Sequence, residues 1–356
     1  MPITVRSFAK INLGLCIGPR RPDGFHDLRT VYQTVAMHDV LRLSIHRGSG
    51  IEIRCADARV PTDETNSCYK MLERAMDALS AKSRVVLEIE KRVPVQGGLG
   101  GASGNAVAAL LGLEIALRKS VPAAERLTIA AQVGSDVPLF LVGGTVLGVG
   151  RGEDVYPLPD LAATACVIAT PEIGVSTPRA FADWDALMNA AEKPAEVGSA
   201  STGEGAPRHA VQSALKLTSC NPFDRINVFG REISAWLSSV PSRKTSNGRF
   251  AGVPAKGRGR AETLLLDLVR TGIENDFEKV VFPQYPALRD VKCALERAGA
   301  FYASLSGSGS ALYGFFKNKT TAEKAVARLR KDGIPAQATT TLTRRQYWKK
   351  FQVSSF

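Results

Sequence analysis

Residues 94–105 are the part of the sequence whose residue types and spacing most directly predict chemistry. They read Pro94, Val95, Gln96, Gly97, Gly98, Leu99, Gly100, Gly101, Ala102, Ser103, Gly104 and Asn105. Glycines let the backbone approach a ligand closely and turn its N–H groups inward. An apolar helix, expected from about Ala102 through Leu117, would direct its positive N-terminal end at the same ligand. The stretch therefore predicts a cradle for an anion such as the phosphates of a nucleotide.

This glycine loop differs from two common phosphate-binding patterns. It lacks the lysine of the G-x-x-x-x-G-K-[ST] loop, and it fits the G-x-G-x-x-G dinucleotide pattern only out of register. The simpler alternative is a tight turn between a strand and a helix, which does not require this many glycines. A second glycine-rich turn, at residues 305–310, would by itself be a hairpin turn. Paired with the first loop, it would close over the phosphates from the opposite side.

The elements around these loops predict a chain with two domains. In the first half we expect strands at 3–17 and 84–93, two strands with a turn near His38 and Asp39 within 24–47, helices at 66–80 and 122–133, and a strand pair within 143–155. In the second half the order is helix 284–298, strand 300–305, strand 311–316, helix 320–331 and strand 334–341. That order predicts a split, ferredoxin-like α+β layer. We place the first domain at 1–162, the second at 163–342 and a basic tail at 343–356.

Two segments of the second half have unusual composition. Residues 190–207 are Ala, Gly, Ser, Thr, Pro and Glu apart from Lys193 and Val197, so they cannot bury apolar surface and predict a mobile insertion. Residues 240–260 carry six basic side chains without an acid and predict a second insertion. Residues 240–260 and the tail together carry ten of the net 46 − 34 = +12 positive charges. We therefore interpret the basic segments as solvated and mobile, and we expect no nucleic-acid partner.

The rest of the composition predicts a reduced, water-soluble protein. The six cysteines are scattered without a C-x-x-C pair, which favours neither a disulfide framework nor a zinc site. The start MPITVRSFAKINL has no long apolar core, so we expect no signal peptide. No uncharged apolar run is long enough to span a bilayer, so we expect no membrane partner. We expect a cytoplasmic enzyme.

At its motifs the sequence resembles the GHMP kinases, the superfamily of galactokinase, homoserine kinase and mevalonate kinases. The resemblance lies in SFAKINLGL at 7–15, PVQGGLGGASGNA at 94–106 and SLSGSGSALYGFF at 304–316. It is closer to the 4-diphosphocytidyl-2-C-methyl-D-erythritol kinases of the non-mevalonate isoprenoid pathway, through RPDGFH at 21–26, GSDVP at 134–138 and NDFE at 275–278. It covers about 4–180 and 262–340 and fails across both insertions. It implies a two-domain α+β fold, with an N-terminal ribosomal-protein-like domain, a C-terminal ferredoxin-like domain and the active site between them.

The resemblance also implies a reaction and its residues. The γ-phosphoryl group of ATP is transferred to the 2-hydroxyl of the cytidine-diphosphate-linked methylerythritol. Asp136 is the base for the hydroxyl proton, and Lys10 keeps it ionised and supports the developing charge. The ATP site is the loop 94–104 with Asn66 beside the adenine, Mg²⁺ is required with Ser103 as its contact, and the enzyme is a monomer or weak homodimer. The substrate contacts are Asn12, Phe25, His26, Lys91 and Thr177, with His26 on the cytosine edge and Phe25 stacked on its face.

The sequence departs from the family pattern in ways that bear on these roles. Phe25 stands where the family usually has tyrosine, and Ser67 makes the adenine wall more polar. Gln96, Ala102 and Gly104 replace Gly, Gly and Ser in the loop. These changes affect the expected ATP and metal geometry more than the reaction class.

Several alternatives stay open at the level of the sequence. Taken alone, Lys10 would be an edge-strand lysine, Asp136 and Asn66 helix caps, and His26 a loop histidine. Another small-molecule GHMP kinase, of the homoserine or mevalonate type, is the alternative within the same class. A non-catalytic RNA-binding protein is the alternative outside it, because the chain is basic and its first domain resembles a fold of ribosomal proteins.

Overall fold

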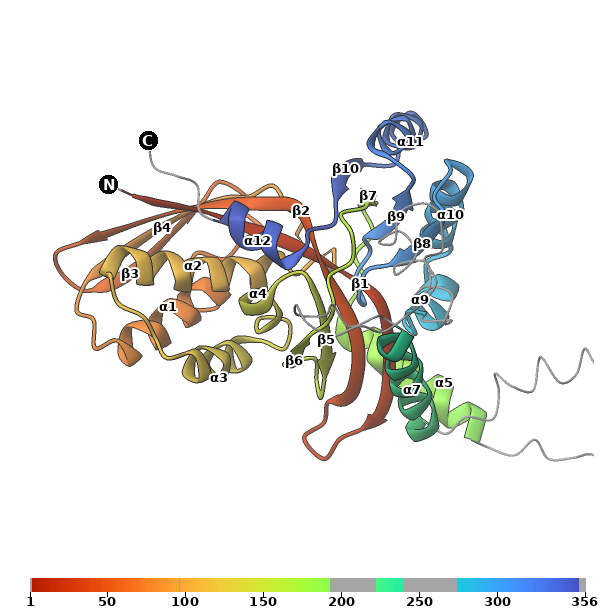
Figure 1. Ribbon diagram of the computed structural model, residues 1–356, viewed down its shortest axis with the longest axis horizontal. Coiled ribbons are helices and arrows are strands. Elements are labelled where there is room, and N and C mark those ends of the chain that lie inside the picture. Colours follow the sequence, from red (N-terminus) through yellow and green to blue (C-terminus); the bar gives the residue numbers. More distant parts are fainter. Residues whose placement is uncertain (1, 96, 193–221, 240–273, 352–356) are drawn as a thin grey trace, which may run out of the picture.

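The computed structural model describes residues 2–95, 97–192, 222–239 and 274–351, and it contains two β-sheets joined in an elongated molecule (Figure 1). The predicted mixed α+β class is confirmed. The last strand of the first sheet ends at Pro157 and the second sheet begins at Ala165. Within the described residues, none of the helices combines the length and apolar composition that crossing a lipid bilayer requires.

The first sheet is organised by a long antiparallel hairpin that runs through the molecule. Strand β1 (Ile3–Arg20) pairs along its length with β2 (His26–His46). The other strands extend the sheet in the order β3-β4-β2-β5-β6, with bounds β3 Gly50–Cys55, β4 Arg84–Glu90, β5 Thr145–Val149 and β6 Asp154–Pro157. The hairpin thereby carries residues from the first sheet to the contact with the second (Figure 1).

The expected turn near His38 and Asp39 was wrong, because β2 is continuous through both residues. Phe8 pairs with His38 and Ala9 with Val35, so β2 accommodates its extra residues as an irregularity in register rather than as a turn. Asp39 is fully buried, and the backbone N–H groups of Arg92 and Val93, just after β4, donate to it. Asp39 therefore makes hydrogen bonds inside the protein, and the pair His38–Asp39 does not form a surface turn.

Helices α1 (Ser67–Ala78), α2 (Gly101–Leu117), α3 (Ala123–Val133) and α4 (Leu139–Val142) cover one face of this sheet (Figure 1). Asn66 caps α1 by accepting a 2.8 Å hydrogen bond from the backbone N–H of Cys68. Pro122 and Gly134 flank α3, in agreement with the helix expected at 122–133. Helix α2 is apolar on nearly all sides because it lies between the sheet and α1, and this burial fixes the direction of its N-terminus.

The second sheet has the order β10-β7-β9-β8, and its neighbouring strands are antiparallel. This is the order of a split β-α-β layer, in agreement with the predicted helix-strand-strand-helix-strand pattern. The strands are β7 Ala165–Ala169, β8 Tyr302–Leu305, β9 Leu312–Phe316 and β10 Ala336–Thr340. The helices are α5 Thr177–Glu192, α7 Pro222–Ser239, α9 Glu278–Gln284, α10 Pro286–Arg297 and α11 Lys319–Lys331.

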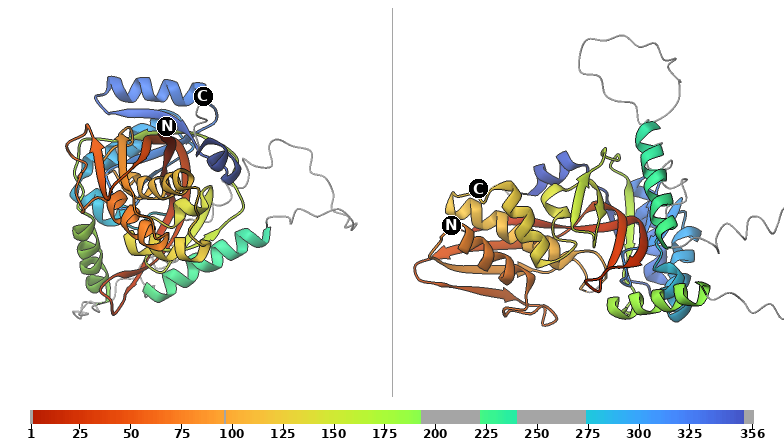
Figure 2. Two further views of the ribbon diagram at one scale, coloured as in Figure 1. Left: turned by 90° about the vertical axis from the view of Figure 1, so that its left-hand side faces the viewer. Right: turned by 90° about the horizontal axis from the view of Figure 1, so that it is seen from below.

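Helix α7 packs against the outer half of the β1–β2 hairpin (Figure 2). Its Ile226, Phe229 and Ile233 are buried in the same apolar cluster as residues of β1. Of the predicted insertion at 190–207, the first three residues close α5. The rest of that insertion, and all of 240–260, lie outside the described residues.

Of the predicted mobile tail at 343–356, the described part is an ordered helix, and residues 352–356 lie outside the described residues. Residues Arg344–Phe351 form helix α12, which packs on the first domain (Figure 1). Tyr347 and Phe351 are buried in the core of that domain, and the Tyr347 hydroxyl donates to the Phe140 carbonyl at 2.7 Å. Arg345, Lys349 and Lys350 are exposed on the other side of this amphipathic helix. The charge of the segment therefore did not reveal its two buried aromatic side chains.

Candidate active site

Two cavities meet at the predicted glycine loop. One, of 380 Å³, lies between the loop and the start of α1, and the other, of 740 Å³, lies between the β1–β2 hairpin, α5 and the second glycine turn. Gly98, Gly100 and Ser103 line both. A ligand in either cavity therefore reaches the same short stretch of backbone, which is the arrangement needed to pass a group between two ligands.

Lys10 and Asp136, predicted to act together, are in contact in the second cavity. The Lys10 Nζ lies 3.1 Å from Asp136 Oδ2, and the lysine side chain is 3% exposed whereas the aspartate is 35% exposed. The backbone N–H of Lys10 donates to the Leu99 carbonyl at 2.9 Å, which ties β1 to the glycine loop. Lys10 is thus a buried cation aimed at a partly open carboxylate, and it is not the solvated edge lysine that the strand pattern alone would favour.

Asn12, predicted to bind substrate, lines the same cavity with its amide fixed on both sides. Its Oδ1 accepts from Lys10 Nζ at 2.7 Å, and its Nδ2 donates to the Thr30 hydroxyl at 2.8 Å. Thr30 in turn donates to the Gly14 carbonyl at 2.7 Å. The chain of donors leaves Lys10 oriented by Asn12 on one side and by Asp136 on the other.

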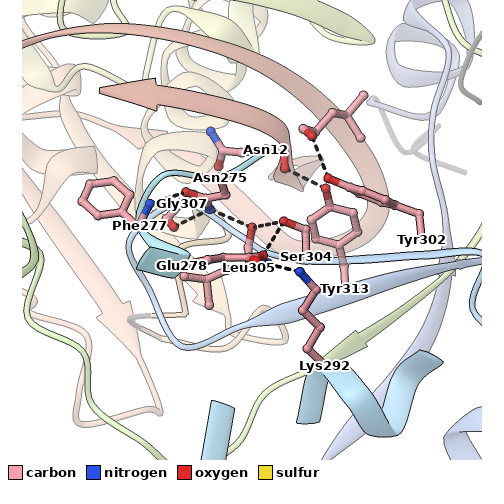
Figure 3. Close-up of polar contacts among 11 residues, drawn as sticks. Asn12, Asn275, Phe277, Glu278, Lys292, Tyr302, Ser304, Leu305, Gly307 and Tyr313 are labelled. Carbon is pink, nitrogen blue, oxygen red and sulfur yellow. Dashed lines mark hydrogen bonds and ion pairs between the residues drawn. The ribbon is translucent and has the colours of Figure 1, made fainter. Parts of the chain in front are cut away.

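Tyrosines of the second sheet hold this part of β1 in place (Figure 3). The Tyr313 hydroxyl donates to the Asn12 carbonyl at 2.8 Å, and the Tyr302 hydroxyl donates to the Leu13 carbonyl at 3.2 Å. Burial raises the pKa of Tyr302 to about 12, so its proton stays in place at neutral pH. The two domains are therefore joined at the strand that carries Lys10 and Asn12.

The NDFE motif shapes the second glycine turn (Figure 3). Asn275 donates from Nδ2 to the carbonyls of Leu305 at 2.9 Å and Gly307 at 2.8 Å. Glu278 accepts from the Ser304 hydroxyl at 2.8 Å and from the Leu305 backbone at 2.9 Å, and Lys292 Nζ lies 2.6 Å from it. These side chains fix the position of Gly307, which lines the second cavity.

The two glycine turns are in direct contact. The Ser306 hydroxyl donates to the Gly98 carbonyl at 3.1 Å, and the Ala311 N–H donates to the Gly97 carbonyl at 3.1 Å. Gly98 has φ of +76°, and a Cβ there would lie 2.1 Å from the Ser306 carbonyl oxygen. Only glycine fits this position, because both the backbone conformation and the approach of the second turn exclude a side chain.

We expect Gly98→Ala to separate the two turns and to weaken nucleotide binding. The methyl group would have to displace backbone, so we expect a loss of ATP affinity of about tenfold or more, with stability reduced by about 1–3 kcal/mol. Calorimetric titration with a non-hydrolysable ATP analogue and thermal unfolding measure the two effects. Gly174→Ala is the matched control, because nothing lies within 4 Å of a Cβ at that position. Unchanged affinity in Gly98→Ala would contradict the assigned role of this contact.

Most of the predicted nucleotide residues line the first cavity, with two exceptions. Asn66 and the described loop residues Pro94, Val95 and Gly97–Ser103 lie there, and Gln96 lies outside the described residues. Gly104 does not line it, because a Cβ on Gly104 would lie 2.8 Å from the Phe8 carbonyl. Glycine at 104 therefore serves the packing of α2 on β1. Cys68 also lines this cavity, and burial raises the pKa of its thiol, which stays protonated.

The structure does not bring Lys91 to the cavity where substrate binding was predicted. Lys91 lines the nucleotide cavity and is held by Asp39, with Lys91 Nζ 2.7 Å from Asp39 Oδ2. Asp39 also accepts from Asn105 Nδ2 at 3.0 Å and from the backbone N–H groups of Arg92 at 2.6 Å and Val93 at 2.7 Å. This buried carboxylate thus fixes the chain on both sides of the glycine loop, and Lys91 neutralises it.

The other predicted substrate residues meet at the far part of the second cavity. His26 Nε2 lies 2.6 Å from Asp185 Oδ1, and its ring stacks on Phe181 with centroids 4.9 Å apart and an angle of 11°. Phe25 is 51% exposed and lies under Arg151, whose Cζ is 5.0 Å from the ring centroid. The Thr177 hydroxyl lies 2.7 Å from that of Ser308, which joins α5 to the second glycine turn.

Sequence reasoning missed several residues of this cavity. They are Tyr32, Arg151, Phe181 and Asp185. Tyr32 and Arg151 lie in strand and turn segments without a motif of their own, and the α5 residues follow Thr177 at helical spacing. A signal for Phe181 and Asp185 was present, since they stand four and eight residues after Thr177 and so share one face of α5 with it.

The described residues contain no cluster of three His, Cys, Asp or Glu side chains that would hold a metal by itself. A Mg²⁺ ion held mainly by nucleotide phosphates needs only one or two protein oxygens. Ser103 lies in the first turn of α2, lines both cavities and supplies a hydroxyl there. The residues present therefore fit a magnesium ion that arrives with a nucleotide, and do not fit an independent metal centre.

Comparison with known proteins agrees with this geometry. The GHMP kinases N terminal domain matches residues 66–144, and the GHMP kinases C terminal domain matches residues 260–334. A 4-diphosphocytidyl-2-C-methyl-D-erythritol kinase of Solibacter usitatus is 33% identical over 328 residues, covering 92% of this chain and 85% of its own. One of the same name from Acaryochloris marina is 30% identical over 327 residues, covering 92% and 91%.

Solved structures share the fold. A crystal structure of 4-(cytidine 5'-diphospho)-2C-methyl-D-erythritol kinase superposes with a TM-score of 0.64 at 25% identity, covering 95% of this chain and 99% of its own. A homoserine kinase from Cytophaga hutchinsonii has a TM-score of 0.63 at 18% identity, covering 96% and 95%. The second likeness concerns the fold alone.

Proposed function

The chain belongs to the GHMP kinases and, within them, to the 4-diphosphocytidyl-2-C-methyl-D-erythritol kinases, and from this we propose that it phosphorylates the 2-hydroxyl of 4-diphosphocytidyl-2-C-methyl-D-erythritol with ATP. One observation carries the proposal beyond family membership. Two cavities share Gly98, Gly100 and Ser103, and the Lys10–Asp136 pair stands in the second of them. ATP in the first and the substrate in the second would meet at these residues.

Asp136 is the base in this reaction. As the substrate oxygen forms its bond to the γ-phosphorus, the bond from that phosphorus to the bridging oxygen of ADP breaks, and the hydroxyl proton passes to Asp136. Lys10, held by Asn12 and Asp136, places a fixed positive charge beside the transferred group. A buried charge already in position stabilises the transition state without having to reorganise.

The glycine loop and α2 bind the phosphates of ATP. The backbone N–H groups of the loop and the N-terminal end of α2 complement negative charge, and the contact with the second turn encloses it. Mg²⁺ bound with ATP supplies further neutralisation of phosphate charge, and Ser103 is the side chain we assign to it. Asn66 borders the end of the same cavity where we place the adenine.

The aromatic end of the second cavity binds the cytosine. Phe25 lies open to the cavity for stacking, whereas His26 is buried with one ring nitrogen held by Asp185. Arg151 and Arg20, which line the same cavity, balance the charge of the substrate diphosphate. We propose that the enzyme acts as a monomer or weak homodimer in the cytoplasm, where ATP is available.

If His26 and Phe25 hold the cytosine, CDP should compete with the substrate and UDP should compete much less. A site built for the amino group of cytosine leaves a buried partner unpaired when a carbonyl replaces it, which costs about 1–3 kcal/mol, or one to two decades in affinity. Calorimetric titration of both nucleotides, with a saturating non-hydrolysable ATP analogue present, measures the difference. Phe25→Ala should weaken CDP binding without changing ATP affinity. Equal affinity for CDP and UDP, or none for either, would reject the cytidyl substrate.

A further inference from the structure

We propose that Tyr32 is a positioning residue that holds the Asp136 carboxylate in the orientation from which it accepts the substrate proton. This inference rests on the proposed function and assigns a role that the sequence motifs do not contain. Tyr32 lies in the middle of β2, outside every motif of the glycine loops and of the substrate segment.

The geometry places a separate donor on each oxygen of Asp136. The Tyr32 hydroxyl donates to Oδ1 at 2.9 Å, and Lys10 Nζ lies 3.1 Å from Oδ2. Lys10 comes from β1 and Tyr32 from β2, whereas Asp136 itself lies in the turn before α4. Two rigid, paired strands thus orient a side chain that its own irregular backbone does not hold. With one donor alone, the carboxylate would be free to rotate about its last bond.

The residues around Tyr32 pack closely against its ring and hydroxyl. Tyr32 is 2% exposed, and its backbone pairs with Asn12 of β1 and Val146 of β5. A Cβ on Gly148 would lie 2.5 Å from Tyr32 Cε2, and one on Gly152 would lie 2.5 Å from the Tyr32 hydroxyl oxygen. The ring therefore lies in a slot bounded by two glycines, and its hydroxyl cannot turn away from Asp136 without displacing backbone.

The chemistry of the pair gives Tyr32 one direction of action. Burial first, and then the neighbouring charge of Asp136, raise the pKa of the Tyr32 phenol well above its ordinary value. The hydroxyl therefore keeps its proton and donates, while the carboxylate only accepts. A carboxylate offers about four lone-pair positions, of which these donors occupy two, so positions remain for the substrate hydroxyl. Tyr32 supports the base without competing for the proton.

Tyr32→Phe removes the hydroxyl and keeps the ring. We expect kcat to fall about tenfold, the effect of one lost hydrogen bond to a charged group, with both KM values within about twofold. Tyr347→Phe is the matched control, because it removes another buried tyrosine hydroxyl that donates at 2.7 Å to a backbone carbonyl and does not touch Asp136. This control should leave kcat unchanged. An unchanged kcat in Tyr32→Phe, or an equal loss in both variants, would overturn the proposal.

A double-mutant cycle separates positioning from general structural support. In the Asp136→Asn background there is no base to orient, so adding Tyr32→Phe should cost nothing further in kcat. An additional tenfold loss there would show that Tyr32 acts elsewhere. Urea unfolding of the wild type, Tyr32→Phe, Asp136→Ala and their double variant measures the contact without any turnover, because alanine removes both oxygens of Asp136, and we expect the two substitutions to be coupled. If the wild type does not phosphorylate the cytidyl substrate, the proposed function fails; if the unfolding energies are additive, the Tyr32 contact fails.

Discussion

Asp136→Asn lowers kcat by about 10²–10⁴-fold and leaves ATP binding intact, if Asp136 is the base. The amide keeps the shape of the carboxylate and its place beside Lys10 but cannot take a proton. The nucleotide cavity does not include Asp136, so calorimetric affinity for an ATP analogue should stay within about twofold. Steady-state release of ADP with saturating substrate measures kcat.

Asp77→Asn is the control for this substitution, because Asp77 is an exposed aspartate on α1 away from both cavities. It should leave kcat and affinity unchanged. Turnover by Asp136→Asn close to that of the wild type would remove Asp136 from the chemical step and leave its contact with Lys10 as a structural ion pair.

Asp39→Asn produces the largest expected loss of stability, about 3–5 kcal/mol in the free energy of unfolding. It leaves Lys91 as a buried ammonium without its counter-charge and places an amide where four hydrogen-bond donors converge. Because two of those donors are the backbone N–H groups of Arg92 and Val93, just before the glycine loop, we expect KM for ATP to rise as well. Urea unfolding and steady-state kinetics measure the two effects.

The double variant Asp39→Asn with Lys91→Met distinguishes a lost charge pair from a lost scaffold. Removing the stranded charge should recover part of the stability, so the double variant should be less destabilised than the sum of the single variants. The raised KM for ATP should persist, because the backbone bonds of Asp39 stay lost. Full additivity in stability would mean that Lys91 and Asp39 contribute independently.

The sequence predicted those parts of the site that local chemistry determines. Glycine spacing predicted the loop, and the Asn66 cap and the flanks of α3 follow from hydrogen bonds within one turn of helix. The contact between Lys10 and Asp136 was predicted from the family resemblance. Without it, the local sequence indicates only an edge-strand lysine and a helix cap. The shared glycine content of the two turns suggested that both face the phosphates, and their direct contact comes from the structure.

What the sequence could not predict are contacts between elements far apart in the chain. The Tyr32–Asp136 and His26–Asp185 bonds join residues 104 and 159 positions apart, so no local pattern records them. Asp39 looked like a turn residue because the backbone N–H groups that donate to it, those of Arg92 and Val93, are far from it in the sequence. Tyr347 and Phe351 were hidden by the lysines and arginines on the exposed side of α12.

One measurement tests the central claim most directly: transfer of the labelled γ-phosphoryl group of ATP to each member of a panel of hydroxyl substrates. The panel consists of 4-diphosphocytidyl-2-C-methyl-D-erythritol, homoserine and mevalonate, with product mass and ³¹P NMR locating the new phosphate ester. We predict that the cytidyl compound gains one phosphoryl group, on its 2-hydroxyl, and that the other two gain none. Phosphorylation of homoserine or mevalonate, with none of the cytidyl compound, would contradict the account.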